Sequence, residues 1–221
     1  MTGPPRTEPL RVRVSGPLAC FSRPELKVER VSYQVMTPSA ARGVLEAILW
    51  KPAIRWHVRR IWVLQPIRWT AFKRNEVGSR MSLASTLVVD DDRQQRHTLA
   101  LSDVDYVIEA EFAFTSQRGP DDVPTKFVEM FARRVEKGQC FHRPYLGCRE
   151  FAADFGPAPE VPPTAPDLRD TTADLGQMLL DIDYRPEPPH IPRFFHAELR
   201  SGVLVEAGRD SLPRMAGGGG P

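Results

Sequence analysis

The feature that most constrains the fold of this chain is a repeated alternation of apolar and polar residues, which is typical of half-buried β-strands. It is clearest in residues 9–15, where leucine or valine occupies every second position. Further strands are predicted at residues 31–36, 54–64, 67–72, 98–101, 106–115, 177–184, 195–199 and 203–206. Residues 76–92, which end in three aspartates, are expected to form a hairpin tip or a loop.

Two segments have the spacing of α-helices instead. Residues 40–50 follow Thr37 and Pro38, which supply an N-cap and a proline at the first helical position. Residues 124–137 begin with a proline and end at Gly138. The order of strands and helices predicts an α+β fold. We expect a ferredoxin-like core of the RNA-recognition-motif type, with an antiparallel sheet and a small C-terminal β-rich extension.

Changes in composition divide the chain into four expected parts. Residues 1–156 form the ferredoxin-like RNA-binding domain, and residues 157–170 form a proline-rich linker. Residues 171–212 are expected to be a small C-terminal β lobe. Residues 213–221, which contain four consecutive glycines, are expected to be a disordered tail.

The distribution of charge indicates a polyanionic partner. Residues 1–80 carry 15 Lys and Arg against 5 Asp and Glu, whereas residues 81–221 carry 15 against 23. Of the 30 basic residues 25 are arginine, whose planar guanidinium binds phosphate oxygens and stacks on bases. The alternative interpretation is a charged face that only meets solvent.

Other features argue against metal sites, cofactors and membranes. The cysteines Cys20, Cys140 and Cys148 lack metal-ligand spacing with the five histidines, so free thiols and no metal or cofactor are expected. The chain contains no run of about 18 apolar residues, and residues 1–8 lack the apolar stretch of a secretory signal. We therefore expect no membrane partner and a cytoplasmic location.

Three segments combine basic groups with aromatic rings or glycines, at residues 27–56, 68–77 and 138–150. In single-stranded RNA recognition the charges follow the phosphates, and each ring can stack a base for about 1–3 kcal/mol. Each ring taken alone could equally belong to the core. The predicted RNA contacts are Lys27, Arg30, Tyr33, Arg42, Trp50, Lys51, Arg55, Arg74, Arg143 and Arg149.

The same segments contain longer phrases that occur in a fixed order. They are Lys-Val-Glu-Arg-Val-Ser-Tyr at 27–33, Thr-Pro-Ser-Ala-Ala-Arg-Gly at 37–43, Trp-Lys-Pro-Ala-Ile-Arg-Trp at 50–56, Arg-Asn-Glu-Val at 74–77 and Leu-Gly-Cys-Arg-Glu-Phe at 146–151. With these phrases the chain resembles the CRISPR-associated Cas-five family of subtype I-C, within the superfamily of repeat-associated RNA-binding proteins. The resemblance spans residues 10–155 and resumes at 175–183.

The resemblance implies a protein of CRISPR antiviral defence. Members of this family look like metal-independent endoribonucleases that process precursor crRNA and then hold the repeat-derived 5′ handle of the guide RNA. The implied partners are crRNA, precursor crRNA, and the backbone (Cas-seven) and large (Cas-eight) subunits of the Cascade surveillance complex. Whether target DNA is also contacted is left open.

The resemblance also implies where the chemistry would reside. Cleavage needs a base for the 2′-hydroxyl, an acid for the 5′-oxygen and a cation near the phosphate. The family uses a tyrosine before Trp-Lys-Pro and a Lys-His pair at the start of the second helix, and the matching positions here are Leu49, Lys126 and Phe127. Because leucine and phenylalanine exchange no protons, only Lys126 is retained.

Three hypotheses follow from this substitution. In the first, the protein is an active endoribonuclease whose acid and base come from elsewhere, with His142 and Tyr33 as candidates. In the second, it is a non-catalytic subunit that caps the guide RNA, which an apolar environment around Leu49 and Phe127 would favour. In the third, it is a general binder of single-stranded RNA outside CRISPR systems.

Overall fold

The computed structural model describes residues 7–26, 28–79, 88–183 and 190–205. Lys27 and the expected tail at 213–221 lie outside the described residues. In chain order the elements are β1 Leu10–Ala19, β2 Arg30–Val31, α1 Pro38–Ile48, β3 Ile54–Val63, β4 Arg68–Val77, β5 Arg93–Phe114, α2 Pro124–Glu136, β6 Asp154–Gly156, a 3₁₀ turn Pro166–Leu168, β7 Thr172–Asp183, β8 Ile191–Arg200 and β9 Val203–Val205.

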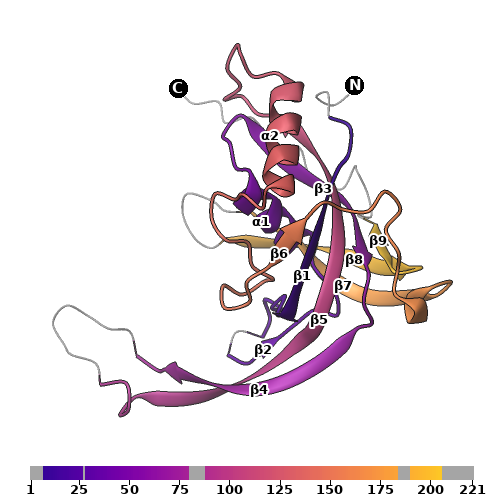
Figure 1. Cartoon of the computed structure of the whole chain (residues 1–221). Coiled ribbons are helices and arrows are strands. Elements are labelled where there is room, and N and C mark those ends of the chain that lie inside the picture. The colour runs from indigo at the N-terminus through magenta and orange to yellow at the C-terminus, as the bar shows by residue number, and fades with distance from the viewer. Residues whose placement is uncertain (1–6, 27, 80–87, 184–189, 206–221) are drawn as a thin grey trace.

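The strands form one curled and mostly antiparallel sheet, so the fold is α+β as expected (Figure 1). The order along the sheet is β6-β1-β5-β3-β9-β8-β7, while β2 and β4 pair with β5 outside this path. Only β2, which is much shorter than the predicted strand at 31–36, lies parallel to its neighbour. Both predicted helices are present.

β5 is a single strand of 22 residues where the sequence indicated two. Ser102 and Asp103 look like a turn, but Ser102 pairs with Leu18 on one side and with Arg68 on the other. Asp103 adopts a positive φ of 52°. It lies between the part of β5 that pairs with β4, which ends at Ser102, and the part that pairs with β3, which begins at Tyr106. Pairing on both sides therefore overrides the local turn preference, and the β4–β5 ribbon curves out from the body (Figure 1).

The helices cover one face of this sheet. The side chain of Thr37 caps α1 by accepting a hydrogen bond from the backbone N–H of Ala40 at 3.2 Å. α2 buries Phe127 and Phe131, and the Phe127 ring lies 5.9 Å from that of Phe112 on β5. The core therefore lies between the two helices and the apolar face of β5.

The opposite face of β5 carries carboxylates that are buried beneath arginines. Glu109 and Glu111 are 4% and 2% exposed, and arginines of β1 and β3 pair with them at distances of 2.8–3.0 Å. Residues 157–165 run across this face, since Arg11 donates to the carbonyl of Glu160 at 2.7 Å. The expected linker is therefore a strap held against the sheet.

The C-terminal strands continue the main sheet, so the small β lobe predicted at 171–212 is joined to it in the part of that range that the structure describes. β9 pairs with β3 from Arg60 to Trp62, and Leu204 on β9 is 1% exposed. Met178 and Phe195, from β7 and β8, belong to the same apolar core as the helices. The apolar face of the β7–β8 hairpin is buried against this core, so it needs no core of its own.

Candidate functional site

A cleft of about 630 Å³ lies where α1, the start of β3, the end of β5 and the ends of β7 and β8 meet. Four of the predicted RNA contacts line it, namely Arg42, Trp50, Lys51 and Arg55. α1 ends before Pro52, so Trp50 and Lys51 lie in the connection to β3 and are exposed. Arg55 is exposed on β3 between the buried residues Ile54 and Trp56, because successive strand residues face opposite sides.

Arg42 forms one wall of the cleft and is fixed in place. Its guanidinium pairs with Glu46 and with Asp181, both at 2.7 Å. Burial alone would lower the pKa of Arg42, but these two carboxylates raise it, so the side chain stays charged. Its buried Nε atom has no hydrogen-bond partner among the described residues. Arg42 also lines a second hollow, of about 500 Å³, which shares Arg42 and Glu46 with the cleft and is lined by Ser22 and Tyr145 as well.

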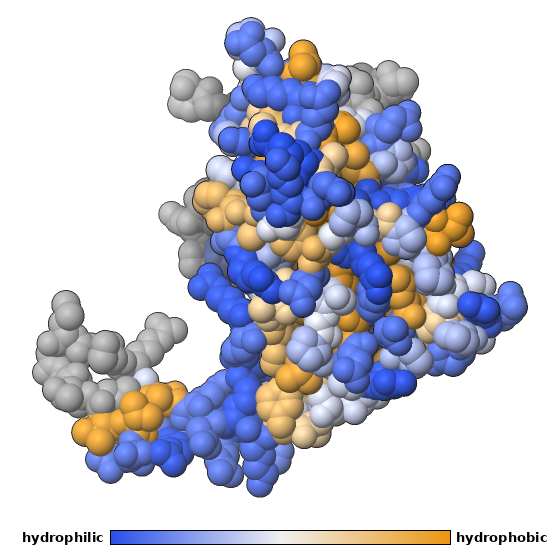
Figure 2. Space-filling view, viewed as in Figure 1, coloured by the Kyte–Doolittle hydropathy of each residue, from blue (hydrophilic) through white to orange (hydrophobic). Residues whose placement is uncertain are grey.

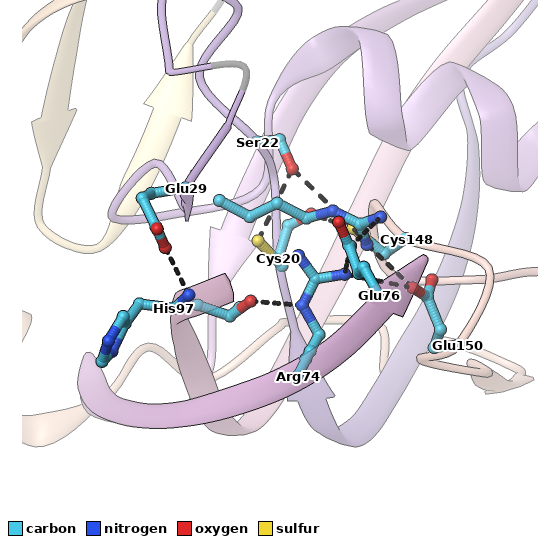
Figure 3. A network of polar contacts seen from close by, with 10 residues as sticks. Cys20, Ser22, Glu29, Arg74, Glu76, His97, Cys148 and Glu150 are labelled. Carbon is cyan, nitrogen blue, oxygen red and sulfur yellow. Dashed lines mark hydrogen bonds and ion pairs between the residues drawn. The ribbon is translucent and has the colours of Figure 1, made fainter. Parts of the chain in front are cut away.

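A separate cluster contains Arg30 and Arg74, which share Glu76 and Glu150; Figure 3 labels Arg74 and the two glutamates. Arg30 pairs with Glu150 at 2.8 Å and with Glu76 at 3.4 Å. Arg74 pairs with Glu76 at 2.5 Å and donates to the hydroxyl of Thr98 at 2.6 Å. These contacts join β2, the β4–β5 ribbon and the loop around residue 150, and they neutralise part of the charge on both arginines.

The remaining predicted contacts lie apart from the cleft. Arg143 is exposed and pairs with Asp154 on β6 at 2.5 Å, and Arg149 is exposed in its loop. Tyr33 is 1% exposed, and burial raises the pKa of its hydroxyl. That hydroxyl faces the backbone of Leu179 but forms no well-aligned hydrogen bond. Arg23 lies over the Tyr33 ring at 4.6 Å. Tyr33 also packs within the buried apolar cluster, so it is part of the core.

Leu49 and Phe127, the two positions that the resemblance matches to acid–base groups, are buried. Leu49 is 0% exposed and Phe127 is 2% exposed, and the Phe127 ring packs edge-on against two other phenylalanines. Lys126 is half-exposed and pairs at 3.0 Å with Asp122, which lies four residues earlier and just before α2 begins. The backbone N–H of Gly119, and then Lys126, lower the pKa of Asp122. Lys126 is therefore held by a carboxylate at the start of α2.

The candidate substitutes do not approach Lys126. His142 follows the other end of α2, and its ring stacks on Tyr145 with centroids 6.5 Å apart. With a rise of about 1.5 Å per residue, Lys126 lies roughly 15 Å from the other end of α2 at Glu136, and His142 follows that end. Tyr33 lies in the core between strands.

The cleft also includes residues that the sequence patterns did not single out. Glu46 and Asp181 hold Arg42, and Gln117 lines the rim beyond β5. Phe141 does not line the cleft, but it is 71% exposed, and its backbone N–H donates to the carbonyl of Ala47 at 2.8 Å near the end of α1. Asp181 cannot be predicted from local spacing, because it reaches Arg42 from the distant strand β7. Phe141 could have been singled out, because it is an aromatic residue in the Gly-rich segment 138–150.

The β4–β5 ribbon differs from the body in surface character. Figure 2 shows that it is hydrophilic where it leaves the body and apolar towards its outer end. Val77, Val88 and Val89 are 39%, 54% and 54% exposed. Within the described ranges no helix is long and apolar enough to cross a membrane, and no group of three or more metal-ligating side chains occurs.

Comparison with known proteins decides the family. The family model Cas_Cas5d, described as CRISPR-associated protein (Cas_Cas5), matches residues 9–205. The chain belongs to the Cas5d family. This confirms the resemblance found in the motifs and places the cleft and the arginine cluster within the region that the Cas5d model matches.

Two curated Cas5d relatives are similar over most of their length, and each is named CRISPR pre-crRNA endoribonuclease Cas5d. The protein of Mannheimia succiniciproducens is 47% identical over 211 residues, covering 88% of this chain and 93% of the relative. The protein of Thermus thermophilus is 48% identical over 213 residues, covering 88% of this chain and 90% of the relative.

Solved structures share the fold of this Cas5d chain. One described as a CRISPR-associated protein has a TM-score of 0.72 and 25% identity, covering 95% of this chain and 97% of the other. A functionally uncharacterized protein from Streptococcus mutans has a TM-score of 0.69 and 21% identity, covering 92% and 94%. The second likeness concerns the fold alone.

Proposed function

We propose that this protein binds the repeat-derived 5′ handle of crRNA as a subunit of a subtype I-C Cascade complex in CRISPR antiviral defence. The observation that carries the proposal is the cleft of about 630 Å³ in which Arg42, Lys51 and Arg55 meet the exposed ring of Trp50. Cations that follow phosphates beside a ring that can stack a base are what single-stranded RNA requires. The names of the curated relatives support precursor crRNA as the RNA from which the handle is cut.

The proposed core is ferredoxin-like, of the RNA-recognition-motif type. The antiparallel order β6-β1-β5-β3, with α1 between β1 and β3 and α2 between β5 and β6, supports this. The open sheet face that such cores commonly offer to RNA is here occupied by ion pairs and the strap at 157–165. We therefore place the RNA in the cleft at the end of α1 and not on the sheet.

The proposal includes cleavage of precursor crRNA, with Lys126 as the cation that stabilises charge at the scissile phosphate. His142 and Tyr33 stay candidates for proton transfer, although neither lies near Lys126. The second candidate function is a non-catalytic cap on the guide RNA. The burial of Leu49 and Phe127 favours it, because the two positions that the resemblance matches to acid–base groups hold enclosed apolar side chains.

Partners and location are part of the same proposal. They are crRNA, precursor crRNA, the backbone (Cas-seven) and large (Cas-eight) subunits, with target DNA contact left open, in the cytoplasm. No metal or other cofactor is proposed. These assignments follow from membership of the Cas5d family, and their support is the match over residues 9–205.

The decisive experiment is a metal-free incubation of the protein with labelled repeat RNA in EDTA, run beside a binding titration. The variants are Lys126→Ala and, as a control at the other end of α2, Lys137→Ala. Cleavage at one site that is lost only in Lys126→Ala supports the endoribonuclease. Tight handle binding without cleavage supports the cap. Equal affinity for a scrambled RNA of the same length would contradict both.

A further inference from the structure

Two of the three cysteines lie together beside the arginine cluster (Figure 3). The hydroxyl of Ser22 is 3.6 Å from the Cys20 Sγ atom and 3.7 Å from the Cys148 Sγ atom. The Cys148 Sγ atom is also 3.5 Å from the backbone carbonyl of Cys20. Residues that are 128 positions apart in the chain thus place two thiols around one hydroxyl.

The backbone is built to keep these thiols close. The N–H of Cys20 donates to the carbonyl of Leu146 at 3.0 Å. Gly147 has a φ of 85°, and a Cβ atom there would lie 2.0 Å from the carbonyl oxygen of Cys20. The loop therefore lies directly against the end of β1, and Cys148 follows at the next position.

The two thiols have different surroundings. Cys20 is 0% exposed, whereas Cys148 is partly exposed and its Sγ atom lies 3.6 Å from the Nη1 atom of Arg30. A hydrogen bond from Cys20, with further help from Ser22 and Arg30, lowers the pKa of Cys148 to about 6 against the opposing effects of burial and Glu150. The hydrogen bond to Cys148 and burial raise the pKa of Cys20.

Arg30 and Glu150 are the charged groups next to Cys148. Glu76 pairs with Arg30, and Arg74 pairs with Glu76 and, at 3.9 Å, with Glu150. The arrangement is thus a partly exposed thiolate beside a cation, with a buried thiol in reach. This is the environment in which a cysteine reacts with oxidants, and a neighbouring thiol resolves the product.

We propose that Cys148 and Cys20 form a redox-active pair that takes a hydroperoxide as its oxidant and closes to a disulfide. The thiolate of Cys148 attacks the O–O bond of hydrogen peroxide, forms a sulfenic acid and releases hydroxide, which takes up a proton to become water. The thiol of Cys20 then attacks the Cys148 sulfur, the S–S bond forms, and the sulfenic oxygen leaves as a second water. Two thiols lose two electrons and two protons, and one peroxide is reduced to two waters.

The order of the two steps follows from burial. Cys20 cannot meet the oxidant first because its side chain is enclosed, so Cys148 is oxidised and Cys20 resolves it. Cys140 is an internal control, because it is partly exposed and no thiol partner lies near it among the described residues. The pair does not depend on RNA binding, so its test is independent of the proposed function.

The test treats the folded, full-length protein with hydrogen peroxide and maps the cysteines by mass spectrometry. We expect loss of the mass of two hydrogen atoms and a Cys20–Cys148 cross-linked peptide, both retained in Cys140→Ser. In Cys20→Ser the reaction should stop at a sulfenic acid on Cys148, trapped by dimedone. Alkylation of Cys148 by iodoacetamide should accelerate with rising pH, with a midpoint near 6, because the thiolate is the nucleophile.

The wild-type map alone can overturn the proposal, whatever the variants do. Oxidation that reaches Cys140 before Cys148, or a Cys20–Cys148 disulfide that forms only after the protein is unfolded in denaturant, would show that the native arrangement is not a reactive pair. Loss of reactivity in Cys148→Ser counts only if its thermal unfolding matches that of the wild type.

Discussion

Removing the two free cations of the cleft, in the double variant Lys51→Ala/Arg55→Ala, should change the salt dependence of handle binding. Lys51 and Arg55 are exposed and line the cleft, and neither makes an ion pair in the part of the chain that the structure describes. Arg30 and Arg42 are less suitable, because removing Arg42 would take the cation from Asp181 and removing Arg30 would leave Glu150 with only the longer contact to Arg74 at 3.9 Å. The double variant therefore tests phosphate contact with little change in folding.

The expected magnitude follows from counterion release. Each phosphate neutralised on a single strand contributes about 0.7 to the slope of log K against log salt concentration, so losing two contacts should reduce the slope by about 1.4. At a salt concentration of about 0.1 M this corresponds to roughly 25-fold weaker binding, and the difference should vanish as salt approaches about 1 M.

The assay is fluorescence anisotropy with a labelled handle RNA over a series of salt concentrations. The matched control is Arg133→Ala/Arg169→Ala, which removes the same charge from exposed positions that do not line the cleft. An unchanged slope in Lys51→Ala/Arg55→Ala, or an equal loss in the control, would refute the reasoning. In the first case the cations touch no phosphate, and in the second only the net charge matters.

Three further predictions concern single residues. Trp50→Ala should weaken handle binding by about 1–3 kcal/mol, because stacking on a base is the expected role of the Trp50 ring. Thermal unfolding should not change, because Trp50 is 54% exposed, and an anisotropy titration that shows no loss of affinity would remove Trp50 from the site. Gly147→Ala should destabilise the protein by about 2 kcal/mol and lower the melting temperature by roughly 4–8 °C, because the new Cβ atom would clash with the Cys20 carbonyl at a positive φ. A melting temperature equal to that of the wild type would mean that the loop moves freely to avoid the clash. Tyr33→Phe should leave the free energy of unfolding within about 1 kcal/mol of the wild type, since it removes a hydroxyl without a well-formed hydrogen bond. The cleavage rate of this variant tests the proton-transfer role: a collapsed rate keeps Tyr33 as a candidate, and an unchanged rate removes it.

Much of the fold could be predicted from local patterns. Thr37 and Pro38 mark the start of α1, Pro124 marks that of α2, and alternation marks β1 and β3, since these signals depend on neighbouring residues alone. The continuity of β5 could not be predicted, because it depends on partners on both sides of Ser102. The place of β7–β9 in the main sheet depends likewise on the pairing of β9 with β3.

The candidate site was predictable in part. The linear phrase at 50–56 contributes Trp50, Lys51 and Arg55 to one cleft, because the turn from α1 to β3 keeps them together. The ion pairs of Arg30 and Arg42 with acidic residues over 100 positions away were not predictable, since they arise from tertiary contact. The burial of Phe127 also required the structure, because a helical phenylalanine near an N-terminus can lie on either face.

The unbroken strand β5 has a consequence for how this protein can vary in evolution. Its inner half contributes to the core and ends at the cleft, and its outer half belongs to the ribbon. Because strand side chains alternate between faces, inserting a single residue within β5 would turn every position of one half to the wrong side. Changes in ribbon length should therefore be tolerated only between Val77 and Arg93, which form the outermost pair in the register of the two strands.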